Sequence, residues 1–215
     1  MIDVYTFWRS SASYRVRIAL ALKGIDYQPR SISLSRGGGE QHGAEYRALN
    51  PQGRVPLLCD GDVRISQSLA IIEYLEDSHP EPPLLPKSAA ARARVRSLAQ
   101  IIACDIQPLQ NMATTQYLSK QLQCSDAQVA AWLVEWITRG MSALETLAAD
   151  DQATGRCLHG DMPTLADCCL VPQCYSARRF GVDMAQFPTL QRIEAHCVAL
   201  PAFLKAAPEQ QLDRT

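Results

Sequence analysis

The stretch FWRSSASYRVRIALALKG, residues 7–24, decides the fold, because a strand gives way to a helix within it. The alternating run at 2–7 predicts the strand, and residues 11–23 predict the helix. The junction gathers three hydroxyls, those of Ser10, Ser11 and Ser13. A serine there either caps the first helical turn or joins the unpaired N–H groups and the helix dipole in holding an anion. From this stretch alone both interpretations stay open.

The bulk properties indicate a two-domain globular protein. The chain has 215 residues, 47% of them hydrophobic and 20% charged, which allows a sizeable core. Its net charge of −1 lacks the basic excess that follows a nucleic-acid backbone. No apolar run approaches the ~20 residues of a membrane helix, and the first residues lack a secretory signal pattern. We therefore expect a cytoplasmic protein that binds neither nucleic acid nor membrane.

The cysteines do not predict a disulfide framework or a metal site. The eight cysteines and four histidines are scattered and form no Cys-x-x-Cys pair. Disulfide frameworks are typical of small secreted chains, and zinc sites need clustered ligands. We expect reduced, mostly buried thiols and no bound metal.

The chain changes character at HPEPPLLP, residues 79–86, which we interpret as a linker between two domains. Domain 1–78 reads β-α-β-α-β-β-α, with strands at 2–7, 27–33, 55–59 and 63–66 and helices at 11–23, 44–49 and 68–77. That order is typical of a small mixed sheet with helices on its faces, and Pro29 puts its strand at an edge. Domain 87–215 is predicted to be all-helical, with helices over 87–119 and 125–149 and others beginning near residues 164, 188 and 201.

Three features of residues 1–78 point to a ligand site. The hydroxyl cluster lies at one helix start, and Gln67-Ser68 lies at another, where a hydroxyl, an amide and free N–H groups suit a carboxylate. Val55-Pro56 opens a strand, is a candidate for a cis bond, and leaves the backbone of Val55 to pair with an extended peptide. Taken singly, each feature has a structural alternative, as a helix cap or as a strand entry.

Taken together, RSSASYRVRIALALKGIDY, LNPQGRVPLL, SQSLAIIEYLE and CDIQPLQN resemble the zeta class of glutathione transferases. That class includes maleylacetoacetate isomerase and maleylpyruvate isomerase. The resemblance continues through LADCCLVPQ and ARRFGVD, so it runs nearly end to end. It implies a thioredoxin-like N-terminal domain, an all-helical C-terminal domain, a homodimer and glutathione as the cofactor.

The resemblance also implies the site. The positions that match glutathione contacts of the class are Ser10, Ser11, Ala12, Gln41, Val55, Gln67, Ser68, Gln107 and Asn111. The γ-glutamyl group is expected at Gln67 and Ser68, the cysteinyl backbone at Val55, and the sulfur at Ser10 and Ser11. A hydroxyl that donates a hydrogen bond to sulfur, aided by the helix dipole, lowers the thiol pKa.

The implied activity is the cis–trans isomerisation of a maleyl keto acid, maleylacetoacetate to fumarylacetoacetate, in aromatic-ring catabolism. Thiolate addition turns the cis double bond into a single bond, and rotation followed by elimination returns the trans isomer and free glutathione. Because the substrate is a dicarboxylate, the site needs cations. Arg9 and Arg179 match the substrate-binding arginines of the class, and guanidinium suits carboxylates.

The chain departs from the class pattern at Ala12, where the class usually has cysteine. We keep the isomerase interpretation because the mechanism needs only the sulfur of glutathione. Met112 and Ala113 replace an extra arginine of the maleylpyruvate branch, which favours maleylacetoacetate. Maleylpyruvate isomerase, a broad transferase or α-halo-acid dehalogenase, and a non-enzymatic binding module remain the alternatives. Thr164 and Asp167 form a capping-box pattern, for which we expect a role in stability alone.

Overall fold

The computed structural model describes residues 1–214. The chain divides into two compact units. The first is Met1–Leu84 together with the chain from Ala199 onward, and the second is Leu85–Val198. Residues 87–215 were expected to form one helical domain. Instead, the segment from Ala199 groups with the first unit, where its helix packs on the first helix of the chain. The predicted linker and domain boundaries otherwise stay a prediction.

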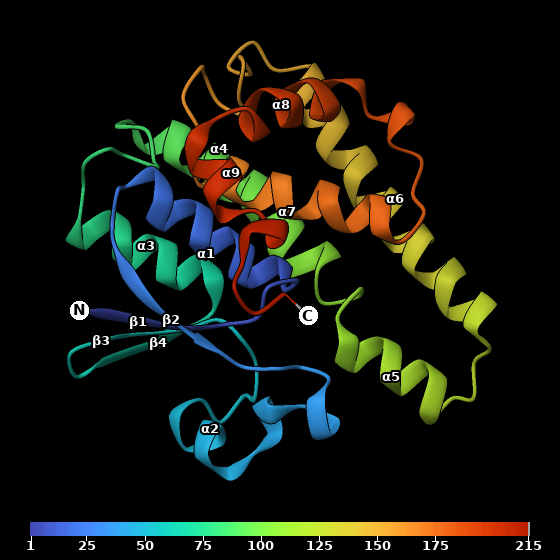
Figure 1. Ribbon diagram of the computed structural model, residues 1–215. Helices are drawn as coiled ribbons and strands as arrows, with labels where there is room; N and C mark the ends of the chain where they lie inside the picture. Colours follow the sequence, from blue (N-terminus) through green and yellow to red (C-terminus); the bar gives the residue numbers. More distant parts are fainter. Residues whose placement is uncertain (215) are drawn as a thin grey trace. The chain divides into compact units, whose positions relative to one another are not determined.

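The first unit is built on a four-stranded mixed sheet (Figure 1). The strands are β1 (Ile2–Thr6), β2 (Tyr27–Ser31), β3 (Leu57–Asp60) and β4 (Val63–Ser66), in the order β2-β1-β3-β4. Strands β1 and β2 are parallel with Ile2 opposite Tyr27, and the other two pairs are antiparallel. The predicted strand order along the chain is confirmed. The edge position predicted from Pro29 is confirmed too, because β2 is an outer strand.

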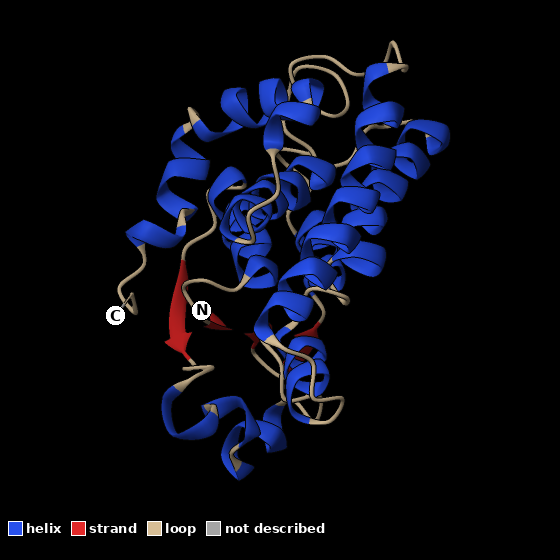
Figure 2. Ribbon diagram, turned by 90° about the vertical axis from the view of Figure 1, so that its right-hand side faces the viewer, coloured by secondary structure: helices blue, strands red, loops and turns tan. Residues whose placement is uncertain are grey.

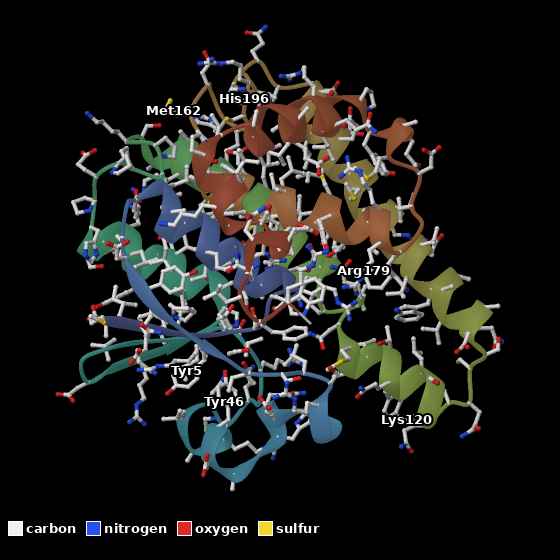
Figure 3. All side chains as sticks on the ribbon, in the orientation of Figure 1. Tyr5, Tyr46, Lys120, Met162, Arg179 and His196 are labelled. Carbon is white, nitrogen blue, oxygen red and sulfur yellow. The ribbon has the colours of Figure 1, made fainter. Side chains whose placement is uncertain are left out.

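Helices cover both faces of this sheet. The helices of the first unit are α1 (Ser11–Leu22), α2 (Ala44–Leu49), α3 (Ser68–Ser78) and α9 (Pro201–Ala206). Figure 1 shows α1 and α3 together on one face and α2 on the other. On the α2 face, Tyr46 packs against Val55 and Leu57. Its ring centroid lies 5.7 Å from that of Tyr5. Both residues are labelled in Figure 3.

The first part of the proline-rich segment is anchored to the first unit. Lys23, at the end of α1, is buried and its Nζ lies 2.8 Å from Oε2 of Glu76. The same ammonium donates to the carbonyls of His79 and Pro82 at 2.7 and 3.0 Å. The N–H of Leu84 donates to Glu76 at 2.9 Å. The charge pair therefore fixes the segment through Leu84, where composition alone predicted only a linker.

The second unit is helical (Figure 2). Its helices are α4 (Ala89–Gln100), α5 (Met112–Lys120), α6 (Asp126–Ala149), α7 (Leu165–Arg179) and α8 (Pro188–Val198). The prediction of one helix over 87–119 is wrong. The chain passes through a π-helical turn at Ile101–Ile106 and leaves helical structure before α5. Pro108 lies in this break, where a residue without an N–H cannot continue the helical ladder.

The capping box predicted at the start of α7 is confirmed. Asp167 is fully buried and accepts the N–H groups of Leu158 and Thr164 and the Thr164 hydroxyl, each at 2.8 Å. Burial raises the pKa of this carboxyl, and the hydrogen bonds oppose that rise. Among residues 1–214, no helix is both long and apolar enough to cross a membrane.

Candidate active site

The start of α1 combines a helix cap with two half-buried hydroxyls, those of Ser10 and Ser11. The Ser10 Oγ accepts the N–H of Ser13 at 3.2 Å, so the capping interpretation is confirmed for Ser10. An accepting hydroxyl still has its own hydrogen to donate. Ser11 and Ala12 follow in the first turn, which contains no acidic residue. The positive end of the dipole is therefore not offset there, and capping and anion binding are compatible.

Val55 presents its backbone beside this unit's core. Within residues 1–214, neither its N–H nor its carbonyl has a hydrogen-bond partner. The preceding carbonyl, that of Arg54, accepts from the Tyr46 hydroxyl at 2.6 Å and from Asn50 Nδ2 at 2.7 Å. The Val55–Pro56 peptide bond is cis. Tyr46 and Asn50 thus fix the loop at Arg54, while the N–H and carbonyl of Val55 can pair with a ligand.

The start of α3 combines a strained residue with a buried cation. Gln67 has φ +73° and ψ +118°, a conformation that favours glycine, and its Nε2 donates to Gln52 Oε1 at 2.8 Å. Ser68 is buried, and its Oγ accepts from Arg15 Nη1 at 3.3 Å. Since a guanidinium only donates, the Ser68 hydroxyl hydrogen remains for an acceptor. Hydroxyl, helix N-terminus and guanidinium together suit a carboxylate.

Arg15 is a functional candidate that the sequence argument missed. Its side chain is 1% exposed in the middle of α1. The available signal was the sequence RVR inside an otherwise apolar helix, where each arginine would ordinarily be assigned to the solvent face. A fully buried arginine needs polar partners, and one of its partners is the serine of the next helix start.

Gln41 adds an orphaned acceptor. It is 3% exposed in the short helical turn Glu40–His42, and its Nε2 contacts His42 Nε2 at 3.1 Å. Its Oε1 is buried, and no partner for it occurs in the described part of the chain. The preceding Gly39 has φ +105°, and a Cβ there would lie 2.5 Å from Gln41 Nε2. Glycine at 39 therefore lets the amide fold back over the turn.

Two candidates of the second unit lie at the helix break. Gln107 follows the π-helical turn, and Asn111 caps α5 by accepting the N–H of Ala113 at 2.9 Å. The break is held by a reciprocal amide pair between buried Gln110 and Gln173, with bonds of 3.1 and 3.0 Å. The predicted contacts thus lie on a loop that side chains fix from within the unit.

The two candidate arginines belong to different units. Arg9 is exposed in the first unit, with its guanidinium 5.2 Å from the Trp8 ring centroid. Arg179 is exposed at the end of α7, with its guanidinium 4.3 Å from the Phe180 ring centroid (Figure 3). The neighbouring Arg178 pairs with Glu194 through two hydrogen bonds.

One group of potential metal ligands occurs among the described residues. The ligand atoms of Cys157, Asp167 and Cys197 lie within 4.8 Å of one another and are buried. A hydrogen bond with Cys157 and desolvation raise the pKa of the Cys197 thiol, which favours its neutral form. Asp167 is already occupied as the capping residue of α7. Packing and capping account for these residues.

Comparison with known proteins identifies the class. Residues 4–83 match the family described as glutathione S-transferase, N-terminal domain. A solved maleylpyruvate isomerase, described as a bacterial zeta-class glutathione transferase, superposes with a TM-score of 0.96 at 46% identity, over 99% of this chain and 100% of that one. The fold is therefore that of a glutathione transferase, with a thioredoxin-like N-terminal part and a helical part, as predicted.

Two further relatives, both maleylacetoacetate isomerases, identify the family within this class. The maleylacetoacetate isomerase of Pseudomonas aeruginosa is 47% identical over 99% of this chain and 98% of its own. The structure of maleylacetoacetate isomerase from Methylobacterium extorquens AM1, with bound malonate and glutathione, has a TM-score of 0.95 at 40% identity, covering 99% of both chains. The chain belongs to the zeta-class glutathione transferase family that contains these isomerases.

Proposed function

We propose that the protein is a glutathione-dependent cis–trans isomerase of a maleyl keto acid. The observation that carries the proposal is the set of ligand-ready groups in the first unit. These groups are the α1 hydroxyls, the Val55 peptide edge, and Ser68 above a buried arginine. They suit an anionic sulfur, an extended peptide and a carboxylate, and glutathione contains all three.

The residues present fit glutathione. Ser68 and Gln67 are proposed to bind the γ-glutamyl group, and Val55 to pair with the cysteinyl backbone. The buried, unpartnered Oε1 of Gln41 is suited to accept one of the ligand's N–H groups. Gln107 and Asn111 are proposed as further contacts, together with Ala12 in the first turn of α1. Relatives crystallised with bound glutathione support glutathione as the ligand.

When bound, glutathione supplies a thiolate that adds reversibly to the alkene and so permits rotation about the former double bond. Ser10 and Ser11 donate hydrogen bonds to the sulfur from the positive end of α1, which favours the ionised form. Without such help a thiol of pKa about 8.5 is only a few per cent ionised at pH 7. The missing cysteine at position 12 removes no group that this chemistry uses.

Arg9 and Arg179 are proposed to hold the substrate carboxylates. Both are exposed cations beside an aromatic ring, and a guanidinium pairs with a carboxylate through two parallel hydrogen bonds. Such pairing orients the substrate and stabilises the charge that develops next to its carbonyl. Maleylacetoacetate is the proposed substrate, since Met112 and Ala113 begin α5 where an extra arginine would favour maleylpyruvate.

We also propose a homodimer that acts in the cytoplasm. Support for the dimer comes from the resemblance to the class. Support for the compartment comes from the eight cysteines, all free and five of them buried, as expected where thiols stay reduced. Light scattering over a concentration series tests the dimer.

The decisive experiment is a spectrophotometric isomerase assay. Maleylacetoacetate and maleylpyruvate are supplied separately, with and without glutathione, to the wild type, Ser10→Ala and Ser11→Ala. Ser88→Ala is the matched control, because Ser88 caps α4 by accepting the N–H of Ala91 at 3.3 Å and has no proposed ligand role. We expect turnover that needs glutathione, prefers maleylacetoacetate and collapses in one of the two α1 variants.

The outcomes separate the alternatives. Glutathione binding without turnover of either acid, combined with thiol consumption on a halogenated acid, would assign the protein to conjugation or dehalogenation. Absence of glutathione binding at millimolar concentration would support a non-enzymatic module. An equal loss of activity in Ser88→Ala would show that capping, and not the α1 hydroxyls, limits activity.

A further inference from the structure

A buried arginine of α1 fixes the loop between β1 and α1 through hydrogen bonds. Arg17 is 1% exposed and donates to four oxygens. These are Thr6 Oγ1 and the Phe7 carbonyl at 3.3 Å, the Trp8 carbonyl at 2.9 Å and the Ala206 carbonyl at 3.0 Å. Three of these acceptors lie in the chain that leads to Ser10, and the fourth lies in α9.

The same loop is held a second time by the C-terminal segment. Asp213 Oδ2 accepts the N–H of Trp8 at 3.0 Å and the hydroxyl of Ser31 at 3.0 Å. Figure 2 shows the last described residues running beside a strand of the sheet, and the Ser31 contact identifies that strand as β2. Trp8 therefore has its N–H fixed by Asp213 and its carbonyl fixed by Arg17.

These contacts reach the proposed sulfur site through one carbonyl. The Phe7 oxygen accepts both from Arg17 Nη1 at 3.3 Å and from the N–H of Ser10 at 3.0 Å. Arg9 lies between the clamped Trp8 and Ser10. Displacing Phe7 or Trp8 would therefore displace the first donor of the site and the proposed substrate-binding arginine together.

We propose that Arg17 and Asp213 are positioning residues for the isomerase, which clamp residues 7–8 so that Arg9 and Ser10 face the reacting groups. The inference rests on the proposed function. The segment after Ala199 would then support the site from the second row of residues, since it contacts none of the proposed glutathione-binding residues directly. Desolvation lowers the pKa of Arg17 to about 10, so the guanidinium still carries its charge at neutral pH.

A buried arginine is a costly way to pack a helix against its neighbours. Removing the charge from water is unfavourable, and an apolar residue of similar volume often gives a fold of equal stability. What the apolar residue cannot do is fix three carbonyl oxygens of two different segments at once. The contacts of Arg17 therefore favour positioning over packing.

The test uses Asp213→Ala and Asp213→Asn in the full chain, because Arg17 variants risk failing to fold. The readouts are kcat, the Kd for glutathione, and the pKa of the bound thiol from its ultraviolet absorbance. The matched control is Asp3→Ala, which removes a carboxylate that pairs with Arg30 of β2 at 3.0 Å and does not touch the loop.

We expect Asp213→Ala to raise the pKa of the bound thiol and to lower kcat about tenfold or more, since small displacements of a catalytic group have large effects. The Kd for glutathione should stay within about threefold, because Gln67, Ser68 and Val55 are untouched. Asp213→Asn should recover most of the loss, since its amide oxygen still accepts from Trp8. Asp3→Ala should match the wild type.

The failures are distinguishable. If the wild type isomerises and Asp213→Ala keeps its kcat and thiol pKa, the clamp is wrong and the proposed function stands. If the wild type binds glutathione but turns over neither acid, the proposed function fails. The positioning role of Asp213 is then decided by whether Asp213→Ala raises the pKa of the bound thiol. If the wild type binds no glutathione, both are overturned.

Discussion

Gln67 is expected to lower the stability of the fold through its strained backbone and to bind glutathione through its side chain. The Gln67→Gly variant should separate these two effects. The Gln67 φ of +73° is a conformation that costs a non-glycine residue about 1–3 kcal/mol. Glycine removes that strain, but it adds about 0.5–1 kcal/mol of backbone entropy to the unfolded chain. The Gln67→Gly variant should therefore gain roughly 1 kcal/mol of unfolding free energy. For a chain of this size that gain corresponds to a rise in Tm of about 2–4 °C.

The same substitution should weaken glutathione binding. A hydrogen bond from the Gln67 amide to a charged γ-glutamyl group is worth about 1.5–3 kcal/mol. Its loss raises Kd about 10- to 150-fold, since about 1.4 kcal/mol is a factor of ten. Calorimetric titration with glutathione measures Kd, and a thermal melt without ligand measures Tm.

The chain offers a matched control for the strain. Gln123 also has a positive φ, +56°, and lies in the second unit; its Nε2 donates to the nearby Lys120 carbonyl at 2.9 Å. Gln123→Gly should raise Tm by a similar amount and leave Kd unchanged. A Gln67→Gly protein that binds glutathione normally would refute the proposed contact. A lower Tm in Gln67→Gly than in Gln123→Gly would refute the strain argument.

Three further outcomes are expected. Asp167→Ala should cost about 3–5 kcal/mol of unfolding free energy, because it leaves buried donors at Leu158 and Thr164 unsatisfied; a urea titration that finds less than about 1 kcal/mol contradicts this. Hydrogen bonds from the Ala153 N–H and from Arg94 lower the pKa of Asp151 below its unfolded value of 3.8. The ionised carboxylate therefore contributes to the free energy of unfolding above pH 3.8, and this contribution is lost as pH falls through the folded pKa. The Tm difference between wild type and Asp151→Asn should therefore shrink below that pH, and a pH-independent difference refutes it. Arg15→Met should raise the glutathione Kd about tenfold or more, with Arg15→Lys intermediate, and equal titrations would contradict the role of Arg15 beneath Ser68.

Local signals predicted the first unit well and the second unit less well. Alternation in IDVYTF, the turn at Asp60–Asp62 and the apolar stripe of 68–77 each report a contact made by near neighbours, and each element formed as predicted. The break at 107–111 depends instead on a pair formed by Gln110 and Gln173, which are 63 residues apart in sequence. The grouping of the segment after Ala199 with the first unit likewise depends on distant partners. Hydrophobic periodicity carries no information on either contact.

Local patterns singled out the candidates at the two helix starts and at Val55, whereas the resemblance to the class supplied the remaining candidates. Arg15 and Arg17 were not singled out, because charge was taken as a sign of exposure. Arg15 and Arg17 are two positions apart, so their side chains leave α1 about 160° apart around its axis. One reaches the start of α3 through Ser68, and the other reaches the loop before α1 and the α9 segment. A single buried helix thus supports the proposed γ-glutamyl site from one side and the proposed sulfur site from the other. A substitution that rotates or tilts α1 should therefore disturb both glutathione affinity and the thiol pKa, whereas changes at Gln67 or Asp213 should each disturb only one.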